Sequence, residues 1–385
     1  MTKTAHPALL PAGLADVLPP DAMLEAKATE DLINSLAACG YERVKPPLIE
    51  FEDTLTSGSG AATADQSFRL MDPVSQRMLA VRADMTIQIA RIATTRFSDA
   101  PRPLRLSYAG QVLRVKGSTL RPERQFGQAG AELIGSVLPA ADAEVILMAH
   151  QALVKLGIRN ISIDLGLPTL VPAICDHLGI TDPINVQQLR TALNQKNPTA
   201  IAKLPEPAAQ LFGTLLNSVG PATDALRVIK DISLPPPALR ECEHLEAVVS
   251  ILRAKAADMT LTIDPLEIRG YEYHSGVTFT FFSPTVRGEL GRGGRYQIPG
   301  YGAPDDPEEA TGVTLFVDTI MRSVPAPEPA RRLLALLETS AKEIADHRAD
   351  GWVVIEALTD HSEPAAEARR LGCSHFIQGG VIKNV

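Results

Sequence analysis

The sequence predicts an α+β fold in which helices flank an antiparallel sheet that carries a helical insertion, with a small α/β domain at the C-terminus. Two long strand-like runs, 104–112 and 125–134, bound a loop that begins at Arg114. Residues from about 167 to 256 change to helical runs separated by prolines. Between 332 and 377, strand and helix patterns alternate, which predicts a small parallel sheet.

Composition limits the class of protein. The chain has 385 residues, of which 45% are hydrophobic and 21% charged, which is enough for two or three domains with their own cores. The formal charge of −8 argues against an extended nucleic-acid surface. With no run of about 18 apolar residues and no signal-like start, we expect a cytoplasmic protein that does not bind membranes. The predicted domains are 1–325, containing the insertion at about 167–256, and 330–385.

Four cysteines are scattered along the chain without a paired CxxC spacing. Neither a zinc site nor a disulfide framework is therefore indicated, and we expect buried, reduced thiols. No other cluster suggests a metal ligand set, so we expect no metal and no cofactor.

The first elements are a helix and a proline-bearing strand. Asp21 follows two prolines and is suited to cap a helix that Gly40 ends. The apolar positions of this helix are four residues apart: Leu24, Ala28, Leu32 and Leu36. A strand is expected over 41–49, and because Pro46 and Pro47 lie in it, it should be an edge strand that needs a partner.

The next elements follow from turn residues and periodicity. A hairpin is expected over 67–86 with its turn at Asp72 and Pro73, then a helix over 141–156 and a strand over 161–165. In the insertion, one apolar stripe is formed by Leu239, Cys242, Leu245, Val249 and Leu252. The last domain is expected to contain strands at 332–337, 351–358 and 374–377 and helices at 340–348 and 364–371.

One face of the run 125–134 is suited to bind a small polar ligand. Strand side chains alternate between the two faces of a sheet, so Gln128, Gly130 and Glu132 share a face. Farther along, the segment 287–300 reads RGELGRGGRYQIPG. Its glycines would allow positive φ angles and close approach of backbone to a ligand, as in a turn that covers a site; they are Gly291, Gly293 and Gly294.

Residues 113–135, LRVKGSTLRPERQFGQAGAELIG, resemble motif 2 of class II aminoacyl-tRNA synthetases, and the histidyl enzymes in particular. The helix and strand within residues 11–51, PAGLADVLPPDA to GYERVKPPLIEF, resemble motif 1, which forms the homodimer interface in that family. The run RADMT at 82–86, the run IRGYEYH at 268–274 and the GGRY run resemble histidyl signatures. The resemblance covers nearly all of residues 5–325, and the C-terminal domain is similar to a trimmed anticodon-binding domain.

The resemblance implies a histidine site without catalytic residues. Asp84 and Thr86 would hold the α-amino group together with Gln128, Arg269 would face the carboxylate, and Glu132 would accept a hydrogen bond from the imidazole. His274 stands where the family has a second tyrosine, and it or a water would serve the other imidazole nitrogen. The residues expected to bind histidine are Asp84, Thr86, Arg114, Gln128, Glu132, Arg269, Tyr273, His274 and Tyr296.

The departures from the family affect ATP. In the family, an acidic residue two places after the motif 2 arginine accepts a hydrogen bond from adenine, whereas Lys116 has donors only. Thr319 stands at the position of the arginine that grips the γ-phosphate, and Phe316 replaces a glycine where adenine needs room. Gln297 replaces an aspartate, and Arg322 is a poor candidate to restore the missing cation.

A retained amino-acid side with lost nucleotide and tRNA contacts resembles the family of regulatory subunits of short-form ATP phosphoribosyltransferase. That resemblance implies a homodimer that assembles with the catalytic subunit into a hetero-oligomer, activates the first step of histidine biosynthesis and mediates feedback inhibition by L-histidine. No nucleic acid is an expected partner. Two alternatives stay open: an active histidyl-tRNA synthetase with unusual ATP contacts, and a histidine-binding regulator of another partner.

Overall fold

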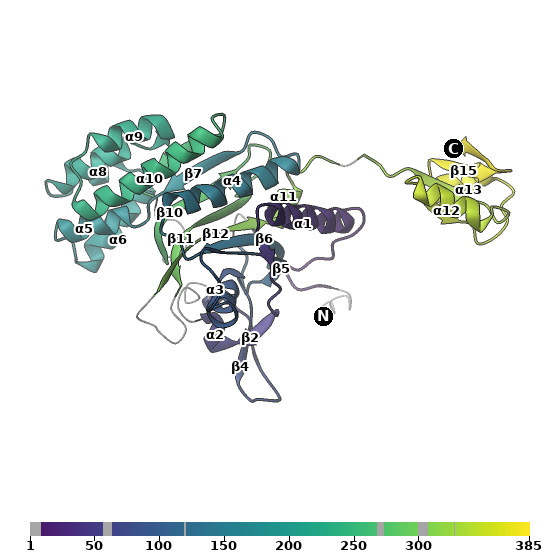
Figure 1. Ribbon diagram of the computed structural model, residues 1–385, viewed down its shortest axis with the longest axis horizontal. Helices are drawn as coiled ribbons and strands as arrows, with labels where there is room; N and C mark the ends of the chain where they lie inside the picture. The colour runs from purple at the N-terminus through teal and green to yellow at the C-terminus, as the bar shows by residue number, and fades with distance from the viewer. Residues whose placement is uncertain (1–8, 57–63, 119–120, 268–272, 299–306, 327) are drawn as a thin grey trace, which may run out of the picture. The chain divides into compact units, whose positions relative to one another are not determined.

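The computed structural model describes residues 9–56, 64–118, 121–267, 273–298, 307–326 and 328–385 (Figure 1). The chain divides into two compact units, Met1–Val324 and Pro325–Val385. Within the described ranges, none of the helices combines the length and apolar character needed to cross a bilayer.

A nine-stranded sheet organises the first unit, with strand order β1-β5-β6-β12-β11-β10-β7-β9-β8. The central pairs from β5 to β7 are antiparallel, which confirms the predicted sheet, while β1 with β5 and β7 with β9 are parallel. The strands are β1 (Glu42–Arg43), β5 (Leu104–Leu113), β6 (Gln125–Ile134), β7 (Ser162–Gly166), β8 (Gly220–Pro221), β9 (Thr260–Asp264), β10 (His274–Phe282), β11 (Gly291–Ile298) and β12 (Glu308–Phe316).

The nine-stranded sheet separates two layers of the first unit (Figure 1), and the side chains of β6 alternate between them. Ala129, Ala131 and Leu133 belong to the large core beneath α1 (Asp21–Ala38), α4 (Pro139–Lys155) and α11 (Val317–Met321). Phe126 and Ile134 face the other way and pack with side chains of α3 (Thr86–Arg96). Gln128 and Glu132 lie on this second face, so the sheet and the segment leading into α3 enclose a polar space.

A small sheet and a helix complete this second side. The predicted hairpin is confirmed as β3 (Arg69–Met71) and β4 (Met78–Val81), and β4 also pairs with β2 (Ile49–Phe51). The short helix α2 (Glu52–Thr56) follows β2.

Two predictions near the N-terminus are wrong. The strand expected over 41–49 is two short strands, because its two halves pair with different sheets and Pro46 and Pro47 lie between them. β1 is nevertheless an edge strand, as the prolines predicted. The N-cap position is occupied by Pro20, so Asp21 is the first residue of α1 and contributes only a favourable charge in its first turn.

The helical insertion is confirmed. It contains α5 (Leu170–His177), α6 (Pro183–Asn194), α7 (Pro198–Ile201), α8 (Ala208–Leu216), α9 (Ala222–Lys230) and α10 (Pro236–Lys255). Proline is the first residue of several of these helices. The N–H at that position makes no hydrogen bond within a helix, so proline, which has no N–H, is tolerated there. Of the predicted stripe on α10, Leu239 is exposed and its neighbour Ala238 is buried, while the other members of the stripe are buried as predicted.

The C-terminal unit has the strand order β14-β13-β15-β16. Its first three strands are parallel, as predicted, and the sequence analysis missed the antiparallel β16. The elements are β13 (Arg332–Ala335), α12 (Ala341–Ala349), β14 (Val353–Glu356), α13 (Pro364–Arg370), β15 (His375–Gln378) and β16 (Val381–Asn384). This unit has two pairs of adjacent arginines, 331–332 and 369–370. Arg370 donates to Glu367, and the guanidinium of Arg331 lies 4.0 Å from the centre of the Trp352 ring.

Candidate functional site

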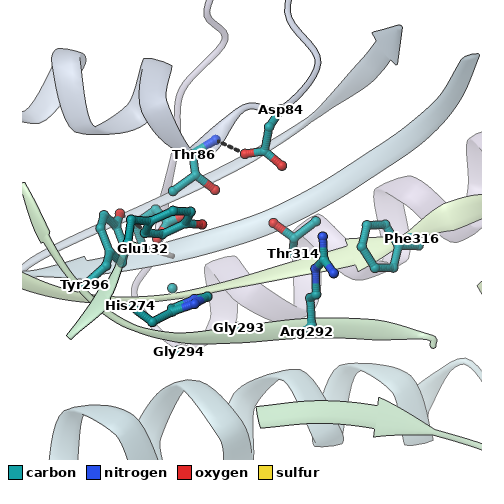
Figure 2. A pocket seen from close by; sticks show the side chains of 12 residues that line it. Asp84, Thr86, Glu132, His274, Arg292, Gly293, Gly294, Tyr296, Thr314 and Phe316 are labelled. Atoms are coloured by element: carbon teal, nitrogen blue, oxygen red, sulfur yellow. Dashed lines mark hydrogen bonds between the residues drawn. The ribbon is translucent and has the colours of Figure 1, made fainter. Parts of the chain in front are cut away.

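A pocket opens on the α3 side of the sheet and is lined by residues of β6, β10, β11 and β12 (Figure 2). Its cavity of about 20 Å³ has room for about one water, so an amino acid could enter only if side chains at its rim moved. The lining residues are Asp84, Thr86, Glu132, Tyr273, His274, Arg292, Gly293, Gly294, Tyr296, Gly312, Thr314 and Phe316. Six of the nine residues that the sequence analysis selected are therefore brought together here.

Glu132 is the buried acid of the pocket, with 1% of its surface exposed. It receives hydrogen bonds from the hydroxyls of Tyr108 at 3.1 Å and Tyr296 at 2.9 Å. Its register partner on β12 is Gly312, and a Cβ there would collide with the Glu132 carboxylate. Burial raises the pKa of Glu132 to about 8, although the two phenol donors lower it. At neutral pH the carboxyl group is therefore largely protonated in the empty site.

This buried acid should make stability depend on pH. The folded protein keeps the Glu132 proton up to about pH 8, whereas an ordinary glutamate releases it near 4.5. Relative to Glu132→Gln, the wild type should have its full stability below pH 4.5 and lose about 1.4 kcal/mol per unit as the pH rises toward 8. Denaturant unfolding of both proteins from pH 5 to 9 measures this difference, and two parallel profiles would contradict it.

Asp84 is held from behind by Gln128. The amide Nε2 of Gln128 donates to Asp84 Oδ2 at 2.7 Å, and its Oε1 accepts from the backbone N–H of Met85 at 3.1 Å. The other Asp84 oxygen accepts from the N–H of Thr86 at 2.9 Å. Gln128 does not line the pocket. The sequence analysis expected it to contact the ligand, whereas in the structure it supports Asp84.

Two other predicted site residues lie elsewhere. Arg114 is outside the pocket lining: its Nε donates to the carbonyl oxygen of Ala83 at 3.3 Å and its guanidinium lies 5.1 Å from the Phe126 ring. Arg269 lies outside the described residues. The turn predicted for Gly291, Gly293 and Gly294 is wrong, because all three belong to the extended strand β11. Their close approach to a ligand stays a prediction; in the structure a Cβ on Gly294 would lie 2.9 Å from the His274 ring.

The space beside the pocket, next to Phe316, is filled by an arginine of the chain itself. Arg121 lies with its guanidinium 3.7 Å from the centre of the Phe316 ring and 4.9 Å from that of Phe126. It donates to Asp318 Oδ2 and to Thr319 Oγ1, both at 3.2 Å. Phe316 and Thr319 are each 1% exposed. A buried, stacked and paired guanidinium therefore occupies the region where the sequence lacks a phosphate-binding arginine.

Arg322, which was considered as a replacement for the missing cation, lies at the C-terminal end of α11 and contacts residues of that helix. Its Nη2 donates to Thr319 Oγ1 at 3.2 Å and lies 3.6 Å from Asp318. Lys116 is exposed, and the side-chain amide of Gln297 donates to Glu309.

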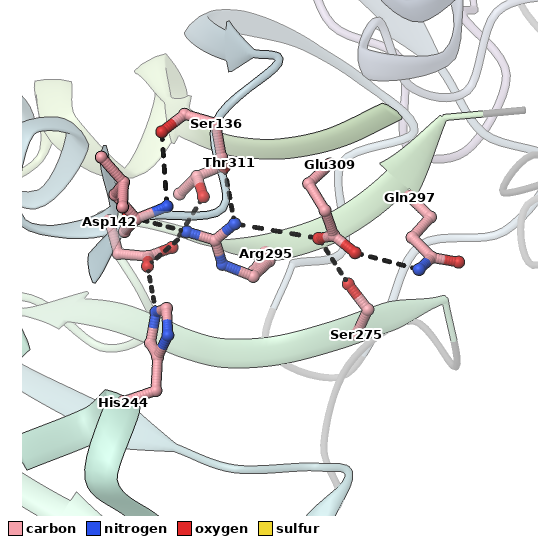
Figure 3. A network of polar contacts seen from close by, with 9 residues as sticks. Ser136, Asp142, His244, Ser275, Arg295, Gln297, Glu309 and Thr311 are labelled. Atoms are coloured by element: carbon pink, nitrogen blue, oxygen red, sulfur yellow. Dashed lines mark hydrogen bonds and ion pairs between the residues drawn. The ribbon is translucent and has the colours of Figure 1, made fainter. Parts of the chain in front are cut away.

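The strand β11 is anchored on its opposite face by a polar network (Figure 3). Asp142 of α4, completely buried, accepts from Arg295 Nη2 at 2.7 Å and from Thr311 Oγ1 at 2.6 Å, and lies 2.7 Å from His244 Nε2. Because His244 belongs to α10 and Arg295 adjoins Tyr296, the network joins the helical insertion to the strand that carries the pocket tyrosine.

Sequence analysis missed several participants, among them Tyr108, Arg121 and Arg292. Tyr108 faces Gly130 across the β5–β6 pair, and a Cβ on that glycine would lie 2.5 Å from its ring. Strand register makes this contact, so no local sequence pattern indicated it. Arg292 alternates with Gly294 and Tyr296 along one strand and so shares their face. For Arg121 we find no sequence signal.

Comparisons with known proteins agree with this geometry. The sequence profile of the histidyl-tRNA synthetase family matches residues 13–320. A protein described as ATP phosphoribosyltransferase regulatory subunit from Paramagnetospirillum magneticum is 50% identical over 375 residues, covering 97% of each chain. A protein of the same description from Rhodospirillum centenum is 50% identical over 378 residues, covering 98% of this chain and 96% of the relative.

Solved structures show the same fold. A Bacillus halodurans protein described as ATP phosphoribosyltransferase regulatory subunit/histidyl-tRNA synthetase superposes with a TM-score of 0.80 at 23% identity, covering 96% of this chain and 97% of that one. Histidyl-tRNA synthetase from a Nostoc species gives a TM-score of 0.77 at 17% identity, with 98% and 94% covered. The predicted class II synthetase-like fold is thus confirmed, and by its near full-length relatives the chain belongs to the family of ATP phosphoribosyltransferase regulatory subunits.

Proposed function

We propose that this chain is a non-catalytic subunit that assembles with the short-form ATP phosphoribosyltransferase catalytic subunit, activates it, and mediates feedback inhibition by histidine. The observation that carries the proposal is the asymmetry of the site. Asp84, Glu132 and Tyr296 line an intact polar pocket, whereas Arg121 and Phe316 fill the neighbouring space that ATP would need.

Histidine is the ligand we assign to the pocket. Its imidazole would lie at the end formed by Glu132, Tyr296 and His274, and its ammonium would lie against Asp84 and Thr86. Bound histidine can inhibit the complex only by binding its active and inactive arrangements unequally. The network at Asp142, which joins the insertion to β11, is a physical connection through which such a difference could reach other parts of the chain.

Dimerisation through α1 and β1 is the assembly we propose for this chain. β1 lies at the edge of the nine-stranded sheet, and an edge strand presents unpaired backbone N–H and C=O groups to a partner. Exposed apolar side chains nearby support a contact there, among them Met23 on α1 and Leu48 just before β2.

Mixing this chain with a short-form catalytic subunit should raise the rate of phosphoribosyl-ATP formation, and this chain alone should have none. Complex formation is measured on a sizing column and the rate by product absorbance, with and without histidine. An unchanged rate and no complex would exclude the regulatory role. Recovery of tRNA in place of a phosphoribosyltransferase subunit, in a pull-down from native lysate, would favour a synthetase.

A further inference from the structure

We propose that Arg292 binds the carboxylate group of the amino-acid ligand, an assignment that rests on the proposed histidine site. Arg292 belongs to β11, where residues at every second position share a face. Gly294 and Tyr296 are on that face, and all three line the pocket. Gly293 and Arg295 alternate with them, and Arg295 reaches Asp142 on the opposite side of the sheet.

The position of Arg292 matches the separation of charges in an amino acid. Figure 2 shows its guanidinium rising from β11 toward Thr314 and Phe316, away from the end formed by Glu132, Tyr296 and His274. Asp84 and Thr86 lie across the pocket from β11. A ligand with its ring at Glu132 and its ammonium at Asp84 would therefore present its remaining substituent toward the Arg292 side.

The charges of the lining residues agree with a zwitterionic ligand. Among the described residues that line the pocket, Arg292 is the one that carries a permanent positive charge. Glu132 is largely protonated near neutral pH because burial raises its pKa to about 8, which leaves Asp84 as the carboxylate that faces the ligand. One fixed anion and one fixed cation complement an ammonium and a carboxylate, and a guanidinium matches a carboxylate with two parallel hydrogen bonds.

The surroundings of Arg292 hold it at the rim and leave it accessible. Its guanidinium lies 5.8 Å from the centre of the Phe316 ring, and the guanidinium of Arg121 lies 3.7 Å from the same ring centre. Its ion pair with Glu289 is long, at 3.6 Å, and 30% of its side chain is exposed. A long, partly solvated pair is weak, so a ligand carboxylate can compete with Glu289 for the guanidinium.

The test compares two ligands that differ at the carboxylate. Calorimetry would measure binding of histidine and of histidinol, which has a hydroxymethyl group in its place, to the full-length chain. Arg292→Gln should weaken histidine binding about tenfold or more, the low end for a charged hydrogen bond because the side chain is partly exposed, and should leave histidinol binding unchanged. Arg292→Lys should recover part of the loss, since it restores charge without the planar fork.

The matched control is Arg287→Gln, which changes an exposed arginine in the connection that leads from β10 into β11 and should bind both ligands as the wild type does. Unchanged histidine affinity in Arg292→Gln, or equal losses for both ligands, would overturn the assignment while leaving the histidine site in place. Equal affinity of the wild type for the two ligands would also overturn it. If the wild type bound neither ligand, the proposed histidine function would fall together with the assignment.

Discussion

The isolated protein is expected to form no histidyl-adenylate and to transfer no histidine to tRNA. Lys116 cannot accept the adenine hydrogen bond, and Thr319 cannot neutralise phosphate charge. The structure adds a steric reason, because Phe316 is buried and Arg121 is stacked on its ring. Histidine-dependent pyrophosphate exchange is the measurement, with an active histidyl-tRNA synthetase assayed in parallel, and exchange well above background would contradict the expectation.

Restoring the two missing groups should not restore the reaction. In Lys116→Glu/Thr319→Arg, the new arginine would meet Arg121, which already donates to Thr319 Oγ1 at 3.2 Å, so two guanidinium groups would repel one another in a buried space. Phe316 would still exclude the purine. A gain of exchange activity in this double variant would show that the steric part of the argument is wrong. Adding Arg121→Ala and Phe316→Gly tests whether the space itself is limiting.

Replacing the pocket acid should separate histidine binding from activation. Glu132→Ala is expected to weaken histidine binding about tenfold or more, because removing one partner of a buried hydrogen bond costs about 1–3 kcal/mol. Activation of the catalytic subunit should be largely retained, since it should depend on the subunit interface. Calorimetry of histidine binding and the activation assay with the partner measure the two effects.

A structural role for Glu132 would have a different signature. Glu132 joins Tyr108 of β5 and Tyr296 of β11, so a variant that merely loosened the sheet would lose stability, affinity and activation together. A thermal melt distinguishes the cases. Glu308→Ala is a suitable control, because that acid lies on the same face of β12 as Gly312 and Thr314 but pairs with Arg102 and does not line the pocket. Unchanged affinity in well-folded Glu132→Ala would place any bound histidine elsewhere.

The sequence by itself determined the elements that depend on local pattern. Alternation along 125–134 placed Gln128 and Glu132 on one face, and turn residues predicted the β3–β4 hairpin. Side-chain direction and turn geometry depend on near neighbours in the chain, so such patterns are readable without the fold. The strand expected over 41–49 failed, because pairing partners decide where a strand ends, and its two halves found different ones.

Only the tertiary structure decided which residues meet and in what electrostatic state. Arg121 and Thr319 are 198 positions apart in the chain, and no local pattern brings a guanidinium to that hydroxyl. Glu132 is adjacent to Gly312 through strand register, and its raised pKa comes from desolvation by several elements at once. Register, burial and packing depend on the whole fold. For this reason the sequence could name Glu132 as a ligand candidate, while its protonation and the filling of the neighbouring space by Arg121 required the structure.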